Sequence, residues 1–399
     1  MYDLIVIGAG PAGVFAAIIA KEKNANIKVL VIEKSQKLLH KILLSGGGRC
    51  NVTNSSFNPK NLVKNYPRGQ KELIAPFHKF GPIDIIKWFE DRNIKLKKEE
   101  DGRIFPMSNS ASTIADCLLL RAKVLNIEIV KRQDIEKVYQ DIDAFKVITK
   151  DEIYTSKKLA ITTGSSAKGF ELAKDLGHSI QRPIPSLFGF NISKFPLKNL
   201  SGVAFKTKLK IKESNFTQKG DILITHFGFS GPAILTLSSI AARYLYDKNY
   251  QAELIVNWIS NLTQIEVYTK LLDLKKRDFQ KILFSENLFH LPKKLWINFL
   301  ESFNEKFKKK LKDIPNKDLL ILSNKLSSDI YSINGTTTNK KEFVTCGGIT
   351  LKEVDFKTME SKICKNLFFA GEILDIDGIT GGFNFQNVWT TAYLLGQSI

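Results

Sequence analysis

The chain has 399 residues, more than one ordinary hydrophobic core accommodates, so we expect two or three lobes. Hydrophobic residues form 43% and charged residues 25% of the sequence, a balance typical of folded, soluble lobes. No apolar run approaches the roughly 20 residues of a membrane span, and the first residues lack the pattern of a secretory signal. We therefore expect a cytoplasmic protein that does not enter a membrane.

The net charge of +19 has two explanations. Such a charge suits a partner rich in phosphates, such as RNA, because binding releases counterions. Lysine, however, far exceeds arginine, and asparagine and isoleucine are abundant, which an AT-rich genome would produce by composition alone. Because the lysines are scattered, we favour this second explanation and expect a small-molecule substrate rather than a nucleic acid.

The four cysteines, Cys50, Cys117, Cys346 and Cys364, stand far apart in the sequence. They form neither a C-x-x-C pair nor a spacing typical of metal ligands. The sequence therefore argues against a disulfide reductase and a zinc protein, and we expect no metal site.

The beginning of the chain reads as strand, glycine turn, helix and strand, which is one βαβ unit. The strands are expected at 4–7 and 28–32, and the helix at 11–20. A helix and three strands continue this α/β lobe; they are expected at 116–125, 127–130, 145–149 and 159–163.

The pattern changes after Pro185. Residues 205–212 alternate apolar and polar side chains, the period of a strand with one buried face, which predicts an antiparallel β lobe. From 264 to 325 the pattern becomes helical, with an aromatic face and lysines around the remainder. That face holds Trp296, Phe299, Leu300, Phe303 and Phe307. We interpret it as a core stripe, and a lysine-rich helix for nucleic acids is the alternative.

Near Phe343 the α/β pattern returns, with a strand at 366–371 and a closing helix at 384–396. The first lobe is thus discontinuous. We expect it at 1–188 and 343–399, an inserted β lobe on the substrate side at 189–262, and a helical insert at 263–342.

A G-x-G-x-x-G fingerprint follows the first strand and opens the first helix. Gly8 permits the tight turn, Gly10 lets the backbone approach a pyrophosphate, and Gly13 lets helix and sheet pack closely. Glu33, at the end of the next strand, can accept hydrogen bonds from an adenosine ribose. This arrangement predicts a Rossmann-type dinucleotide site at the helix N-terminus.

Two further segments distinguish FAD from NAD. Residues 41–54 are rich in glycine and polar donors that suit a pyrophosphate and a flat ring. Near the other end, residues 371–378 follow a strand and carry carboxylates for ribityl hydroxyls, and residues 381–386 open a helix whose N-terminus can stabilise reduced flavin. The sequence therefore predicts a noncovalent FAD. The residues expected to bind it are Gly8, Gly10, Pro11, Ala12, Gly13, Glu33, Lys34, Lys41, Ser45, Gly46, Gly47, Arg49, Cys50, Asn51, Asn54, Ile135, Thr163, Gly164, Gly371, Glu372, Asp377, Gly381, Gly382, Phe383 and Asn384.

Four motifs give the chain a resemblance to a known family. They are S-G-G-G-R-C-N-V-T-N at 45–54, T-H-F-G-F-S-G-P at 225–232, T-M-E-S-K at 358–362 and the glycine-rich stretch at 370–384. Together they resemble the HI0933-like (YhiN/BaiN-type) flavoproteins along essentially the whole chain. The resemblance implies a discontinuous, GR2-like FAD lobe with an inserted β lobe and a small helical lobe. It also implies amine oxidation of the aminoacetone oxidase kind or enone reduction.

Three side chains are candidates for further roles, each with an alternative. His226, between a β run and a glycine turn, is a candidate catalytic acid or base near the flavin, or it hydrogen-bonds loop backbone only. Arg103 is a second catalytic candidate that reaches the flavin or an anionic substrate, or a structural arginine of a hairpin. Cys50 is a thiolate near the flavin or, as we favour, a buried small side chain. We expect Phe229 to lie beside the flavin ring together with His226.

The leading hypothesis is an FAD-dependent oxidoreductase that passes a hydride between a small organic substrate and flavin N5. Dioxygen, NAD(P)H or another carrier would complete the cycle. An FAD-dependent tRNA-modifying enzyme and a nonenzymatic flavin redox sensor are the alternatives. The sequence leaves the substrate, the direction of electron flow and the oligomeric state open.

Overall fold

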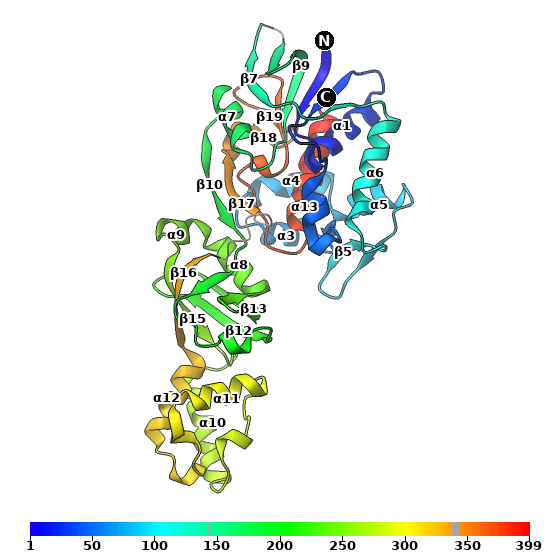
Figure 1. Cartoon of the computed structure of the whole chain (residues 1–399). Helices are drawn as coiled ribbons and strands as arrows, with labels where there is room; N and C mark the ends of the chain where they lie inside the picture. The colour runs from blue at the N-terminus through cyan, green and yellow to red at the C-terminus, as the bar shows by residue number, and fades with distance from the viewer. Residues whose placement is uncertain (143, 337–343) are drawn as a thin grey trace. The chain divides into compact units, whose positions relative to one another are not determined.

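The computed structural model describes residues 1–142, 144–336 and 344–399. The chain divides into two compact units (Figure 1). Unit 1 comprises Met1–Pro185 and Val344–Ile399, and unit 2 comprises Ser186–Phe343. The predicted boundary at 342 and 343 lies outside the described residues.

Unit 1 is built on a sheet whose central strands are parallel. β1 (Tyr2–Ile7) pairs in parallel with β2 and with β9, and its last four residues are all buried. Continuous apolar runs of this kind are typical of strands covered on both faces. The strand order along the sheet is β18 (Val354–Asp355), β19 (Glu360–Ser361), β20 (Leu367–Phe369), β9 (Ile153–Ile161), β1, β2 (Val29–Ile32) and β6 (Glu128–Val130), with β7 (Ile135–Gln140) and β8 (Phe145–Thr149) joined to β9.

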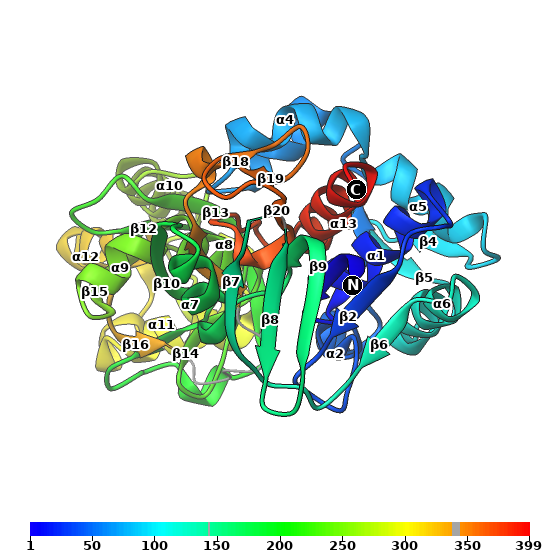
Figure 2. The ribbon, with the colours of Figure 1, turned by 90° about the horizontal axis from the view of Figure 1, so that it is seen from above.

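Two helices from opposite ends of the sequence pack side by side in unit 1 (Figure 2). They are α1 (Pro11–Lys23) and α13 (Phe383–Gln397). A side chain at Gly396 of α13 would meet Ile19 Cβ of α1 at 2.7 Å, so glycine allows the close approach. The C-terminal helix thereby completes the core that the first βαβ unit begins.

The remaining elements of unit 1 surround this core. They are α2 (His40–Leu44), β3 (Thr53–Asn54), α3 (Pro59–Leu62), α4 (Gln70–Lys79), α5 (Pro82–Glu90), β4 (Leu96–Lys98), β5 (Arg103–Pro106), α6 (Ala111–Val124), α7 (Ala167–Asp175), and the paired strands β10 (Ile180–Ser186) and β17 (Val344–Ile349).

Unit 2 is a closed antiparallel barrel with helices attached. Its strand order is β11 (Phe190–Ile192), β14 (Gly228–Ser230), β13 (Thr217–Ile224), β12 (Ala204–Ile211), β15 (Gln251–Asn257) and β16 (Asp329–Thr336). The strand with one buried face that the alternation at 205–212 predicts is confirmed as β12. Thr207, Leu209 and Ile211 are buried, and the lysines between them are exposed. β16 comes from a stretch predicted to be part of the helical insert, and it pairs with β15 and β11 to close the barrel.

Within its described residues, unit 2 also has five α-helices, and three of them, α10 to α12, gather at one end of the barrel (Figure 1). They are α8 (Pro232–Ile240), α9 (Ala242–Asp247), α10 (Gln264–Arg277), α11 (Lys293–Glu301) and α12 (Asn316–Ser327). The predicted aromatic face extends beyond a single helix: α11 ends at Glu301, and Asn304 adopts a left-handed φ of 56°. Phe303 and Phe307 therefore reach the core from the following turns.

Within the part of the chain that the structure describes, the helices are all too short or too polar to cross a membrane.

Candidate functional site

The glycine turn at the end of β1 has the backbone that the fingerprint predicts. Gly8 has a left-handed φ of 101°, and a Cβ there would lie 3.0 Å from the carbonyl oxygen of Thr162. A Cβ at Gly13 would lie 1.9 Å from the carbonyl oxygen of Gly8, whereas one at Gly10 would meet nothing within 4 Å. The turn is therefore packed at Gly8 and Gly13 and open at Gly10, where α1 begins.

Glu33 closes the other side of this turn. One carboxylate oxygen accepts a 2.8 Å hydrogen bond from the backbone N–H of Ala9, and the other accepts one of 2.8 Å from Ser35. The side chain is held between β2 and the turn but remains partly exposed. Each oxygen keeps a lone pair for a further donor, such as a ribose hydroxyl.

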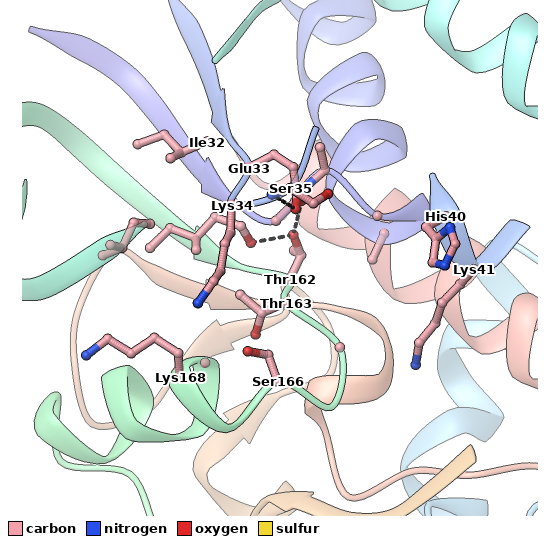
Figure 3. A pocket seen from close by; sticks show the side chains of 18 of the residues that line it. Ile32, Glu33, Lys34, Ser35, His40, Lys41, Thr162, Thr163, Ser166 and Lys168 are labelled. Atoms are coloured by element: carbon pink, nitrogen blue, oxygen red, sulfur yellow. Dashed lines mark hydrogen bonds between the residues drawn. The ribbon is translucent and has the colours of Figure 1, made fainter. Parts of the chain in front are cut away.

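A cavity of about 560 Å³ opens above the turn and lies wholly in unit 1 (Figure 3). Its walls come from the β1 turn, the end of β2, the start of α2 and the residues after β9. Lys34, Lys41 and Lys168 extend along its rim in Figure 3. Lys34 pairs with Asp134 at 3.0 Å and Lys168 pairs with Glu171 at 2.7 Å. The positive potential that a pyrophosphate requires therefore comes mainly from the N-terminus of α1.

Residues distant in sequence meet at one edge of this cavity. The ammonium group of Lys41 pairs with the carboxylate of Glu372, which is mostly buried. The other oxygen of Glu372 accepts a 3.1 Å hydrogen bond from the backbone N–H of Thr345. Glu372, which follows β20, and Thr345 of β17 therefore contribute to the same site as the first βαβ unit.

Two buried polar atoms in the cavity wall lack a partner. Among the described residues, the hydroxyl oxygen of Thr163 and the side-chain oxygen of Gln133 have no hydrogen bond. An unpaired buried polar atom costs about 1–3 kcal/mol, so such atoms mark places where a ligand is expected. Their position in the walls of the cavity fits a hydroxylated, polar cofactor.

The structure brings eleven of the predicted FAD-binding residues to the cavity wall. They are Gly8, Gly10, Pro11, Ala12, Glu33, Lys34, Lys41, Ile135, Thr163, Gly164 and Glu372. Sequence reasoning missed residues of the wall that carry no motif, among them Ser35, Lys37, His40, Gln133 and Lys168. They follow strand ends, which is the one signal that could have found them.

The sequence matches the model of the HI0933-like protein Rossmann domain over residues 2–398. The chain belongs to the HI0933-like family. This membership confirms the resemblance and the Rossmann-type fold that the motifs predict. By its family the chain is an FAD-dependent oxidoreductase.

Two relatives of this HI0933-like protein align along nearly its whole length. A ribosomal RNA dihydrouridine synthase of Escherichia coli is 29% identical, and the match covers 100% of this chain and 98% of that protein. A 3-dehydro-bile acid delta(4,6)-reductase of Clostridium scindens is 25% identical, with 98% of each chain covered.

Solved structures share the fold of the HI0933-like chain. The 3-ketosteroid-delta4-(5alpha)-dehydrogenase of Rhodococcus jostii aligns with a TM-score of 0.50 and 12% identity. The alignment covers 99% of this chain and 96% of that one. At this identity the likeness shows the fold alone.

The two glycine-rich segments of the HI0933-like protein pack on each other in unit 1, outside the cavity wall. The side-chain amide of Asn54 donates to the carbonyl of Gly381 at 2.9 Å, and a Cβ at Gly382 would lie 2.4 Å from the carbonyl oxygen of Thr53. The predicted residues in these two segments are Ser45, Gly46, Gly47, Arg49, Cys50, Asn51, Asn54, Gly371, Asp377, Gly381, Gly382, Phe383 and Asn384. Gly13 also lies outside the cavity wall, where it packs against Gly8.

Two members of this group have internal roles. The Asp377 carboxylate is completely buried and forms a two-pronged ion pair with Arg68. Cys50 is also completely buried, and burial raises the pKa of its thiol to about 12. A protonated thiol is a poor nucleophile, so the geometry favours the buried, inert alternative for Cys50.

Arg103 lies at the start of β5 in a small hairpin of unit 1. Its guanidinium lies 2.6 Å from the carboxylate of Asp101 and 3.2 Å from that of Glu99. Arg49 shares Glu99 at 2.6 Å and lies over the Phe105 ring at 4.0 Å. Because these partners already satisfy its charge, the geometry favours the structural alternative for Arg103.

The T-H-F-G-F-S-G-P segment lies in unit 2, and its two aromatic side chains differ in burial, because Phe227 is exposed and Phe229 is buried. The prediction that Phe229 faces the flavin is wrong, because its side chain is fully buried in the barrel. It packs there against Phe195 and Tyr331, with ring centroids 5.0 Å away in each case. His226 is exposed at the tip of the turn, and its catalytic role stays a prediction.

Proposed function

We propose that this chain uses FAD to reduce a carbon–carbon double bond conjugated to a carbonyl group in a small organic substrate. The flavin would be held in the unit 1 cavity, and NAD(P)H would supply the electrons. The observation that carries the proposal is the cavity itself, in which a helix N-terminus, Glu33 and two unpaired buried oxygens meet.

Each part of FAD has a proposed partner in the wall of the cavity. Glu33 would accept the ribose hydroxyls of the adenosine, and the open backbone at Gly10 would bind the pyrophosphate at the start of α1. Lys41 would lie near the phosphates, while Thr163 and Glu372 would contact hydroxyls beyond them. FAD when bound supplies hydride chemistry, and the protein supplies orientation and electrostatics.

The choice of substrate bond rests on the chemistry that the two relatives share. Dihydrouridine is uridine with its carbonyl-conjugated C5–C6 bond reduced, and the delta(4,6)-reductase acts on a ring system that carries a 3-keto group. Conjugation to a carbonyl makes such a double bond electron-poor, so that one of its carbons can accept a hydride and a carbon next to the carbonyl can then take up a proton. The reactions in the names of both relatives therefore share one kind of substrate bond, an electron-poor double bond conjugated to a carbonyl group.

A second candidate substrate is uridine within RNA. The net charge of +19 and the 29% identity to a ribosomal RNA dihydrouridine synthase both favour it. The chemistry at the double bond would be the same, but recognition would depend on phosphates and hence on salt.

The experiment that tests the proposal follows flavin reoxidation without dioxygen. The purified protein is reduced with NADPH or NADH, then mixed with 2-cyclohexenone, with uridine or with a uridine-rich ribosomal RNA fragment. We expect one of the conjugated substrates to return the oxidised flavin spectrum and to be recovered in its saturated form. Saturated cyclohexanone serves as the matched control.

Rapid reoxidation by the RNA fragment alone would move the assignment to the second candidate. Reduction of the flavin by primary amines, with no reoxidation by any conjugated substrate, would contradict the proposal and favour an amine oxidase.

A further inference from the structure

A hollow of about 620 Å³ lies in the wall of the unit 2 barrel and shares no residue with the flavin cavity. It is lined by Asn191, Ile192, Lys194, Phe195, Lys198, His226, Phe227 and Asn334. The described residues of the lining hold two ammonium groups and an imidazole but no carboxylate. Among the described residues, neither lysine has an ion-pair partner.

The turn that borders this hollow is fixed to the barrel. The backbone N–H of Ile192 donates to the carbonyl of Phe227 at 2.9 Å, and Thr225 N–H donates to the carbonyl of Gly228 at 2.9 Å. A Cβ at Gly228 would lie 2.1 Å from the carbonyl oxygen of Phe190, so the turn packs directly on β11. His226 and Phe227 are therefore presented by a rigid hairpin.

Phe227 is 72% exposed at the tip of this hairpin, although Phe229 two residues later is fully buried. An exposed phenyl ring on a fixed turn contributes little to folding. It offers a flat apolar face in the same hollow as two ammonium groups. Single-stranded nucleic acids are bound by this combination, because their bases stack on aromatic rings and lysines bind their phosphates.

We propose that the hollow at Lys194, Lys198 and Phe227 binds a nucleotide, with its phosphate on the two lysines and its base on the phenyl ring. Asn191 and Asn334 use their amide N–H groups internally, on Thr336 and Ser193, which leaves their side-chain oxygens to accept from a base or ribose. The nucleotide is either free or part of an RNA chain, and the proposal does not depend on the flavin chemistry.

The test measures binding of uridine 5′-monophosphate, inorganic phosphate, uridine and a hexamer of uridylate to the full-length protein by calorimetry. We expect uridine 5′-monophosphate to bind more tightly than either part alone. The double variant Lys194→Ala, Lys198→Ala should bind uridine 5′-monophosphate and inorganic phosphate each about tenfold more weakly than the wild type does. Phe227→Ala should weaken binding of the mononucleotide about fivefold or more and leave phosphate unchanged.

The matched control replaces Lys206 and Lys208, two exposed lysines of β12 outside the hollow, by alanine. This variant loses the same charge and should bind the mononucleotide as the wild type does. An equal loss in the control variant, or no binding of the mononucleotide to the wild type, would overturn the proposal.

The hexamer of uridylate distinguishes a site for free nucleotides from a site for RNA. Binding of the hexamer that exceeds that of the mononucleotide tenfold or more identifies RNA, and equal binding identifies a free nucleotide; both outcomes support the site. Retained mononucleotide binding in a flavin-free Gly10→Ala protein would show that this site is separate from the flavin site.

Discussion

Glu33 is the residue on which the adenosine half of the proposed flavin site depends. Its two carboxylate oxygens join the end of β2 to the glycine turn through Ala9 and Ser35, and the same oxygens face the cavity. One side chain thus both shapes the turn and offers the acceptors for a ribose. The spacing from the fingerprint predicted the second role, but the first required the folded backbone.

Replacing Glu33 by alanine should weaken FAD binding by about 1–3 kcal/mol, because a charge-assisted hydrogen bond to the ribose is lost. Fluorescence of FAD released on dilution measures the dissociation constant. Glu136→Ala, at an exposed position on β7, is the matched control and should leave it unchanged. Equal FAD affinity in Glu33→Ala and wild type, with both proteins folded, would place the adenosine elsewhere.

At the scale of elements, the junction of β1 and α1 carries two glycines with different constraints. Gly13 is closed in by the Gly8 carbonyl oxygen at 1.9 Å and the Thr162 hydroxyl at 2.5 Å from a built Cβ, whereas Gly10 faces open space. One glycine is required for packing and the other for the approach of a ligand.

This difference predicts opposite outcomes for two alanine substitutions. Gly13→Ala should lower the free energy of unfolding by about 3 kcal/mol, because helix and turn must separate. Gly10→Ala should leave the melting temperature of the FAD-free protein unchanged and weaken FAD binding, because its methyl group would occupy the pyrophosphate's path. Thermal melts with and without FAD check both. Loss of stability in Gly10→Ala alone would contradict the assignment.

A buried histidine contacts two other segments of unit 1 through its two ring nitrogens. His178, between α7 and β10, lies 3.1 Å from Glu353 through Nδ1 and 2.8 Å from the Ser361 hydroxyl through Nε2. The Ser361 oxygen already accepts hydrogen bonds from the backbone N–H groups of Ile363 and Cys364, so its own proton is left to donate to Nε2. The imidazole is therefore neutral, and this network accounts for the serine of the T-M-E-S-K motif.

Burial lowers the pKa of His178 below its usual value, despite the opposing effect of Glu353. As pH falls, the histidine takes up a proton in the unfolded chain before it does so in the folded protein. The contribution of neutral His178 to the free energy of unfolding is therefore present above the ordinary pKa of about 6.5 and is lost as pH falls below it. Melts at pH 7.5 and 5.5 should show a smaller loss of stability on acidification in His178→Gln than in wild type. His78→Gln, at an exposed position of α4, should behave like wild type. A pH dependence identical in all three proteins would exclude the effect.

At the scale of the whole molecule, local patterns predicted the α/β lobe and an antiparallel β lobe, but not that the β lobe closes into a barrel. The βαβ unit and the alternating strand at 205–212 were predictable because their periods report burial directly. β16 was missed because it follows a helical stretch and completes the barrel only by pairing with residues far along the chain. Gln133 and Lys168 were missed because they belong to no motif, although each follows the end of a strand, β6 or β9.

The fit of FAD to the unit 1 cavity is the central claim, and the flavin content of the purified protein tests it most directly. The protein is passed through gel filtration after incubation with FAD, and its absorption spectrum and released flavin are measured. We expect a yellow protein with about one FAD per chain, because the fingerprint and the unit 1 cavity together provide for one dinucleotide. A folded, colourless protein that takes up no FAD would contradict it.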